Sequence, residues 1–225
     1  ITGNAPGNDM RFYWERVEAR RNFANKIWNA SRFIMMNMEK ADTDSVELSR
    51  LTQADRWILS KVNTLAKEAT ENLEKFEMGI AADKIHSFIW EEFCDWYIEM
   101  VKPRLWNDED ETKAAAIWTL KTVLIQSLKL LHPYMPFITE EIFCNLQEEE
   151  ESIMVSEWPA FREEWNYAKD EAAVDTIKAA VRGIRNIRTE MNVAPSKKAT
   201  VYVVSDKEAV RQIFEDSKVF FATLG

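Results

Sequence analysis

Apolar side chains recur at intervals of three and four residues along most of this chain, and few residues interrupt the pattern. The 225 residues include only 5 Gly and 6 Pro, whereas 46% are hydrophobic. Such a repeat places apolar side chains on one face of each helix, and that face has to be buried against other helices. The sequence therefore predicts a mainly α-helical fold, and the chain is long enough to enclose a core.

The first predicted helix runs from about Phe12 to Met38, with one break expected near Arg20. Its buried stripe is expected at positions three or four residues apart, namely Phe23, Ile27, Ala30, Ile34 and Met38. A second helix begins at Thr52 and ends near Lys75. Its inward-facing side chains are expected to be Trp57, Leu65 and Leu73.

Two further long helices are predicted from the same periodicity. One runs from Met78 to Val101 and ends at Lys102-Pro103, because the residue before a proline disfavours the helical region. The next runs from Thr112 to Leu131, follows the acidic loop 107–111, and ends at His132-Pro133. Long helices joined by short loops are typical of an antiparallel helical bundle.

A run of four glutamates, Glu148–Glu151, follows a short helix predicted over Phe137–Leu146 and marks a domain boundary. Residues 12–147 are expected to form the bundle, and residues 148–225 a small α/β subdomain. The expected elements of that subdomain are an extended piece at 153–156, a helix at 170–191, a strand at 199–204 and a helix at 206–214. Residues 1–11, which do not begin with Met, are expected to be a linker from a longer polypeptide.

The net charge is −9, but basic residues gather in two places. Residues 1–32 hold six Lys or Arg against three Asp or Glu, and residues 177–198 hold six against one. Two basic islands on an acidic body could meet the phosphates of a nucleic acid. The plainer interpretation is that these charges form solvated helix faces.

The two cysteines, Cys94 and Cys144, lack the paired spacing of a zinc or redox site and are predicted to be free, buried thiols. No apolar stretch is expected to reach the ~20 residues of a membrane span, and the N-terminus lacks a signal-peptide pattern. A cytoplasmic protein without membrane contact is therefore expected.

The sequence contains no phosphate-binding glycine loop, nucleophile elbow or zinc spacing. Asp83 and His86 resemble half of a di-iron site, but the further carboxylates and the second pair that such a site needs are missing. His86 is expected to be a surface or capping residue, and His132 a helix-end residue. Neither a metal site nor a catalytic residue is predicted, which disfavours an independent enzyme with a site in the bundle core.

Three stretches resemble one family. GNDMRFYWERVEARRNFANKIWNASRF, residues 7–33, is similar to the start of the anticodon-binding domain of valyl-tRNA synthetases. HPYMPFITEEIF, residues 132–143, and VRGIRNIRTEMNVAPSKKATVYV, residues 181–203, resemble the same family, so the likeness spans nearly the whole chain. The resemblance implies a tRNA-recognition module of an enzyme that ligates valine to its tRNA. The equivalent domain of an isoleucyl- or leucyl-tRNA synthetase is the alternative within this class.

The two ATP-site signatures of a class I synthetase do not occur in these residues, nor does the C-terminal coiled-coil arm of the family. The resemblance therefore implies that ATP and Mg²⁺ act in a catalytic domain outside this fragment, which would hold no cofactor and would not aminoacylate alone. The partners that it implies are a valine-specific tRNA and the catalytic domain and C-terminal arm of the same parent chain. A helical scaffold for protein partners is the alternative from another class.

One face of the first helix carries polar side chains and an aromatic ring at i, i+4, i+7 and i+11, namely Asn22, Lys26, Asn29 and Phe33. The resemblance implies that Lys26, Asn29 and Phe33 contact the anticodon, with base edges bound by polar groups and a base stacked on the ring. Arg21 and Arg32 are candidates for contacts with backbone phosphates. Without the resemblance, the same polar residues would be interpreted as a solvated face and Phe33 as a core residue.

A second basic stripe lies on the helix predicted at 170–191 and consists of Lys178, Arg182, Arg185 and Arg188. It runs beside an apolar set made of Val174, Ile177, Val181, Ile184 and Met191. Contact with the tRNA backbone is predicted for Arg182, Arg185 and Arg188. Docking onto the missing catalytic domain is the alternative role.

Overall fold

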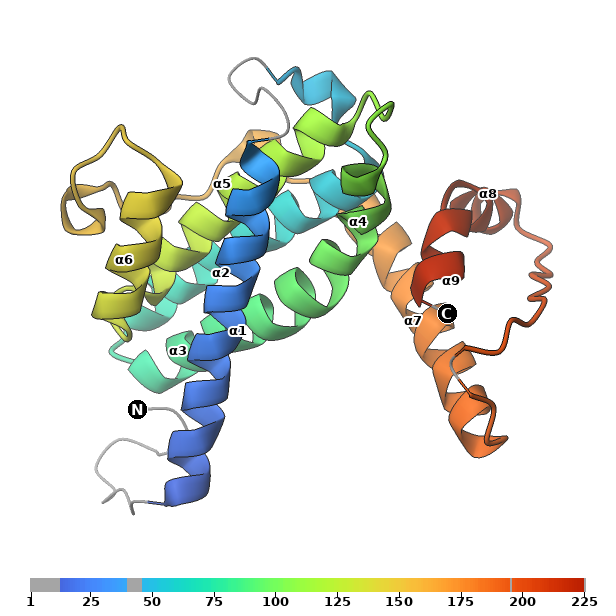
Figure 1. The fold of residues 1–225 in the computed structure, drawn as a ribbon, viewed down its shortest axis with the longest axis horizontal. Helices are drawn as coiled ribbons and strands as arrows, with labels where there is room; N and C mark the ends of the chain where they lie inside the picture. Colours follow the sequence, from blue (N-terminus) through green and yellow to red (C-terminus); the bar gives the residue numbers. More distant parts are fainter. Residues whose placement is uncertain (1–12, 40–45, 195, 225) are drawn as a thin grey trace. The chain divides into compact units, whose positions relative to one another are not determined.

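The computed structural model describes residues 13–39, 46–194 and 196–224, and the chain forms two compact units, residues 1–166 and 167–225 (Figure 1). The predicted linker at 1–11 lies outside the described residues. The segment at 148–166, expected to belong with the second part, packs on the first unit. Asn63 on α2 (Gln53–Glu74) exchanges two hydrogen bonds of 2.7 Å with the backbone of Arg162, and the indole of Trp158 donates to the hydroxyl of Thr70.

The first unit is the predicted helical bundle (Figure 1). Its elements are α1 (Trp14–Met38), η1 (Leu48–Arg50), α2 (Gln53–Glu74), α3 (Met78–Ser87), η2 (Phe88–Tyr97), α4 (Ile98–Trp106), α5 (Lys113–Leu131), α6 (Pro136–Leu146), η3 (Ile153–Val155) and η4 (Glu163–Trp165). The segment η2 is π-helical, and η1, η3 and η4 are single 3₁₀ turns. The extended piece predicted at 153–156 is therefore the turn η3.

Helix α1 is unbroken, so the break expected near Arg20 does not occur. Four of its five predicted core side chains are buried, namely Phe23, Ile27, Ala30 and Ile34. Met38 is only half-buried, and Asn37 is buried in its place. The amide of Asn37 can be buried because its Nδ2 donates a 2.7 Å hydrogen bond to the carbonyl of Phe33.

The predicted end of the third helix at Lys102-Pro103 is wrong. The helix passes through η2 and continues as α4 to Trp106, with Pro103 inside it. A proline removes one helical hydrogen bond and crowds the preceding turn, which costs about 3 kcal/mol. Contacts beyond Pro103 offset this cost, because Leu105 is buried and Arg104 is bound to α2 and to the start of α5.

Asp55 of α2 and Arg104 of α4 form a largely buried ion pair, with side chains 0% and 13% exposed. Two parallel hydrogen bonds of 2.8 and 2.9 Å join them. Asp55 also accepts from the Tyr97 hydroxyl at 2.6 Å and from the backbone N–H of Thr52 at 2.8 Å, which caps α2. Arg104 donates further to the carbonyl of Thr112, where α5 begins. Burial, together with the Asp55 carboxylate, holds the pKa of Tyr97 well above its usual value.

The length and apolar composition of α5 would suffice for a membrane span, contrary to the expectation from the sequence. The structure gives another reason for its apolar character, because 61% of its most apolar window is buried. Helices α1, α2, α4 and α6 all contact α5. Its end at Leu131, with His132 as the C-cap residue, agrees with the sequence prediction.

The second unit consists of α7 (Ala168–Glu190), α8 (Glu208–Asp216) and α9 (Lys218–Leu224). The predicted strand at 199–204 does not form, so the described part of this unit is helical and not α/β. An alternating apolar segment becomes a strand only when a neighbour accepts its backbone hydrogen bonds, and this segment is exposed along its length. Tyr202 and Val204 are 85% and 92% exposed.

Substitution of Asp55 by Asn should lower the free energy of unfolding by about 3 kcal/mol, because it leaves the largely buried Arg104 guanidinium without its counter-charge. Urea unfolding followed by circular dichroism measures the change. Asp83→Asn is the matched control, since Asp83 is an exposed helical carboxylate and its loss should change stability by less than about 0.5 kcal/mol. Equal stabilities of the two variants would contradict the central role of the ion pair.

Candidate functional site

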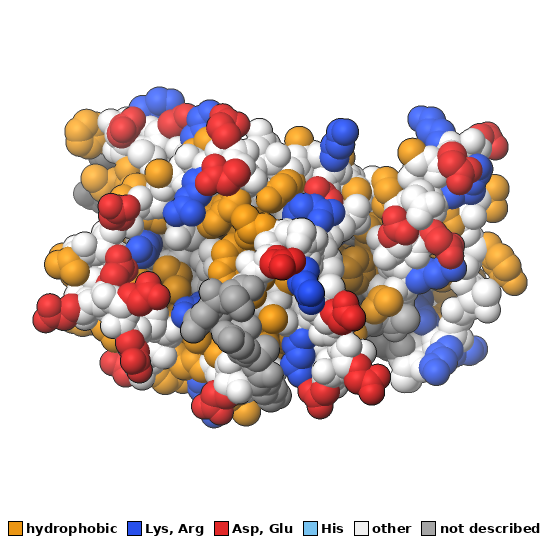
Figure 2. Space-filling model, turned by 90° about the horizontal axis from the view of Figure 1, so that it is seen from above, with side chains coloured by type: hydrophobic (Ala, Val, Ile, Leu, Met, Phe, Trp, Pro, Cys, Tyr) orange, Lys and Arg blue, Asp and Glu red, His pale blue; other side chains and the backbone are white. Residues whose placement is uncertain are grey.

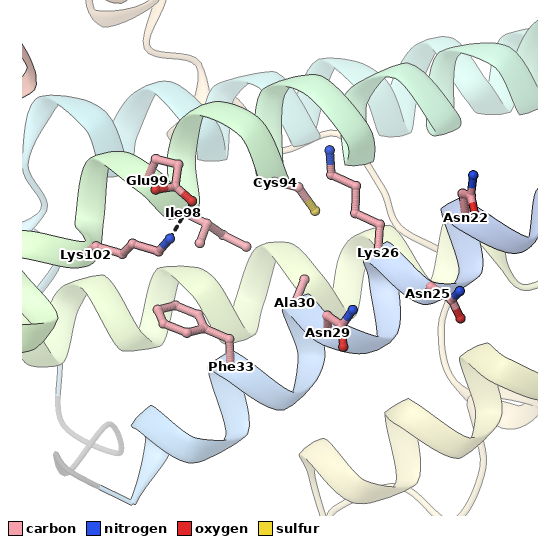
Figure 3. Close-up of a pocket in the computed structure, with 10 residues that line it drawn as sticks. All are labelled: Asn22, Asn25, Lys26, Asn29, Ala30, Phe33, Cys94, Ile98, Glu99 and Lys102. Atoms are coloured by element: carbon pink, nitrogen blue, oxygen red, sulfur yellow. Dashed lines mark hydrogen bonds and ion pairs between the residues drawn. The ribbon is translucent and has the colours of Figure 1, made fainter. Parts of the chain in front are cut away.

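The polar face predicted on α1 borders a groove of about 470 Å³ in the first unit (Figure 3). Helix α1 forms one wall, and η2 with α4 forms the other. The groove is lined by Asn22, Asn25, Lys26, Asn29, Ala30, Phe33, Cys94, Ile98, Glu99 and Lys102. All four residues of the face predicted on α1, namely Asn22, Lys26, Asn29 and Phe33, therefore lie at one groove, because their helical spacing keeps them on one side of the helix.

The three Asn side chains of α1 that line the groove remain accessible to a ligand. Asn22, Asn25 and Asn29 are exposed, whereas the neighbouring apolar stripe of the same helix is buried in the bundle. Each amide offers a donor and an acceptor, which is the combination needed to bind the edge of a nucleotide base. Phe33 is half-buried, so its ring is fixed by the bundle while part of it borders the groove.

Lys26 is less available than the sequence suggested. Its Nζ lies 2.5 Å from the Asp95 carboxylate and 3.8 Å from the centre of the Trp90 ring, and its side chain is only 22% exposed. Figure 3 shows this side chain leaving α1 and reaching toward η2. Lys26 therefore links the two walls, and its charge is compensated by Asp95 and by the face of the indole.

Lys102 reaches into the groove from α4. Its Nζ lies 2.5 Å from Oε1 of Glu99, one turn earlier on the same helix, and 5.9 Å above the centre of the Phe33 ring. Glu99 and Lys102 are 38% and 25% exposed, so water reaches this ion pair. The groove thus contains two lysines, each with a carboxylate partner, and has little net charge of its own.

Cys94 and Ile98 give the wall opposite α1 an apolar part, and both are buried. Burial raises the pKa of Cys94 to about 12, so the thiol is neutral and behaves as a small apolar group. Both cysteines are free, as expected, but Cys144 is exposed and the expectation of burial is wrong for it. Cys144 lies on the face of α6 that points away from the core, whereas Ile142 and Phe143 of the same helix are buried in the core.

The structure corrects the expectation for His86, which is neither a surface nor a capping residue. Its ring is half-buried and lies 4.3 Å from that of Phe23 and 6.0 Å from that of Trp90. Burial in this stack lowers the pKa of His86, and the nearby Arg20 charge lowers it further. In the part of the chain that the structure describes, no cluster of three or more His, Cys, Asp or Glu side chains could hold a metal ion.

The residues predicted to contact phosphates lie outside the groove. Arg21 and Arg32 are exposed on α1, and Arg182 and Arg185 are exposed on α7 of the second unit. Arg188 is half-buried and donates two hydrogen bonds, of 2.8 and 2.6 Å, to the carbonyl of Lys197.

The burial of three side chains on α7 also differs from the prediction, one in the basic stripe and two in the apolar set beside it. Lys178 is buried and does not share the exposed face, whereas Val174, Ile177 and Val181 are buried as predicted. Ile184 is only half-buried, and Met191, at the end of the helix, is 71% exposed.

Figure 2 shows Lys and Arg side chains interspersed with Asp and Glu on the visible face, without a continuous basic surface. That face therefore offers no extended surface for general attraction of phosphates.

Sequence reasoning did not identify the second wall, namely Cys94, Ile98, Glu99 and Lys102, or Asn25 on the first. The signal for Lys102 was present, because residues 94, 98 and 102 recur at intervals of four and Glu99 stands one turn before Lys102. Ending the helix at Lys102-Pro103 hid this face. The pairing of α1 with a helix about 70 residues away cannot be obtained from periodicity within either helix.

Comparisons with known proteins place these features in a family context. The family model described as the anticodon-binding domain of tRNA ligase matches residues 55–203. A valine–tRNA ligase of Clostridium tetani is 50% identical over 227 residues, covering 100% of this chain and 25% of its own length. The valine–tRNA ligase of Clostridium perfringens is 54% identical, covering 93% of the chain and 24% of the relative, and that of Carboxydothermus hydrogenoformans is 42% identical, covering 100% and 25%. The chain thus spans about a quarter of the length of these relatives.

The lowered pKa of His86 predicts that stability depends on pH below neutrality. The unfolded chain, in which this histidine has its ordinary pKa of about 6.5, binds the proton first. Stability from the neutral ring is therefore fully present above pH 6.5 and is lost as the pH falls toward the folded-state value. Urea unfolding at several pH values should show this loss for the unaltered chain and a smaller one for His86→Phe, which keeps a ring between Phe23 and Trp90. The same acid slope for both chains would contradict the assignment.

Proposed function

We propose that this chain, which belongs to the anticodon-binding domain family of tRNA ligases, binds the anticodon loop of a tRNA in the groove between α1 and η2–α4. The observation that carries the proposal is the convergence of three exposed Asn amides, an accessible Phe33 ring and two lysines on one groove. Proteins recognise RNA sequence mainly in single-stranded loops, whose bases leave the stack and expose their hydrogen-bonding edges.

The chemistry of the groove suits bases better than phosphates. Asn29 can donate to one atom of a base edge and accept from another, and the Phe33 ring offers a stacking plane. The two lysines do not add a large uncompensated charge, because Asp95 and Glu99 accompany them. Recognition in the groove would therefore depend on the shape and hydrogen-bonding pattern of bases, which carry sequence information.

Valine specificity is part of the proposal and rests on the names of the relatives, which are valine–tRNA ligases. We assign ligation of valine, with its ATP and Mg²⁺, to a catalytic domain of a longer polypeptide. The catalytic domain and a C-terminal arm of that polypeptide would be the protein partners of this chain. In this chain, we assign anticodon recognition to four residues of α1, namely Asn22, Lys26, Asn29 and Phe33.

Contacts with the tRNA backbone are proposed for the exposed arginines outside the groove. Arg21 and Arg32 lie on the same helix as the base-binding residues, and Arg182 and Arg185 lie on α7. Phosphate contacts position the RNA without selecting its sequence. Docking of α7 onto another domain is the other role open to that stripe.

Substitution of Phe33 by Ala should weaken binding of an anticodon stem-loop by about 5- to 150-fold, the effect of losing roughly 1 to 3 kcal/mol of stacking. Fluorescence anisotropy of a labelled valine stem-loop at low salt measures the affinity, since the net charge of −9 opposes binding. Phe137→Ala is the matched control, because Phe137 is 90% exposed on α6 and lies outside the groove. A folded Phe33→Ala variant that binds as tightly as the control would refute the site.

A further inference from the structure

Lys102 occupies the face of Phe33 on which a base would stack. Aromatic rings stack with centroids about 4.5 to 7 Å apart, and the Lys102 ammonium lies 5.9 Å from the Phe33 centroid. Figure 3 shows the Phe33 ring directed from α1 toward the Lys102 side chain. A base and this ammonium would therefore compete for the same space.

Glu99 holds Lys102 in this position. The 2.5 Å contact between Nζ and the carboxylate fixes the end of an otherwise flexible side chain. Both residues lie on α4, one turn apart, so the pair forms without any movement of the helix. The pair is partly exposed, and such pairs are weak enough for a ligand to break.

We propose that Lys102 is a further RNA-contacting residue of the groove, held over Phe33 by Glu99 until an entering base displaces it toward a phosphate of the same loop. This inference rests on the proposed function and extends the RNA contacts to the second wall of the groove, formed by η2 and α4. The base takes the ring face, the ammonium exchanges a carboxylate for a phosphate, and Glu99 acts as an anionic restraint on entry. Glu99 is a positioning residue in this scheme, because it acts through Lys102.

The scheme accounts for the neutral groove. A lysine paired with a carboxylate attracts phosphates weakly. RNA that brings only phosphates, without an unstacked base, therefore gains little binding free energy from the groove. A loop with a base that stacks on Phe33 releases the lysine and acquires a phosphate contact. Phosphate binding would then be coupled to base stacking, which favours unpaired loops over duplex RNA.

The test is a double-mutant cycle on the affinity of the valine anticodon stem-loop and on its salt dependence. Glu99→Gln should tighten binding by about two- to fivefold, the range expected for release of a partly exposed ion pair. Lys102→Gln should reduce the slope of log affinity against log salt by about 0.7, the loss of one phosphate contact on a single strand. In the Lys102→Gln background, Glu99→Gln should no longer tighten binding, because its effect operates through the lysine.

The ion pair between Lys84 and Glu68 provides matched controls with the same change of charge. Its atoms lie 2.9 Å apart, both side chains are partly exposed, and neither residue lines the groove. Glu68→Gln and Lys84→Gln should leave affinity and salt slope nearly unchanged.

A gain from Glu99→Gln that persists without Lys102 would show simple repulsion of RNA by Glu99 and would overturn the restraint. An unchanged salt slope in Lys102→Gln would overturn the phosphate contact. If Phe33→Ala weakens binding while the cycle shows no coupling, this inference fails and the proposed function stands. If the unaltered chain binds no stem-loop, both fail.

Discussion

The bidentate pair of Asp55 and Arg104 fixes the geometry on which the rest of the first unit depends. Asp55 belongs to the first turn of α2 and also accepts from Tyr97 of η2, while Arg104 extends from α4 to the start of α5. A buried charge without its partner is strongly destabilising, so these elements are held in one arrangement. The pair also explains how a helix continues through Pro103 when proline would normally end it.

The groove is a consequence of that arrangement. Arg104 lies two residues beyond Lys102 on α4. Because Asp55 anchors the Arg104 side chain, this turn of the helix is fixed and Lys102 stays directed toward α1. The opposite wall is fixed by the buried stripe of α1, which leaves the amides of Asn22, Asn25 and Asn29 toward solvent. Because the lysines of the groove are paired with acids, general attraction for phosphate is small, and under the proposed function bases would be distinguished by hydrogen bonding and stacking.

Periodicity was sufficient to predict what is local to each helix. It located α2, α5, α6 and α7 to within a few residues and placed Asn22, Lys26, Asn29 and Phe33 on one side of α1. It failed where contacts between distant segments override local preference. Pro103 stays helical because of Arg104, and the alternating segment at 199–204 is not a strand because a strand also requires a partner. The wall formed by η2 and α4 was missed for the same reason, since no local pattern specifies which helix faces α1.

Recognition of the anticodon by the groove can be measured with two stem-loops, titrated against the unaltered chain at low salt. One carries the valine anticodon, and the other is altered at its central and third anticodon bases. A groove that recognises base edges through hydrogen bonds should bind the valine loop at least about tenfold more tightly, since one well-placed base contact contributes roughly 1 to 3 kcal/mol of discrimination. Equal affinities for the two loops would mean that the chain senses only the charge of RNA, and would contradict recognition of the anticodon by this groove.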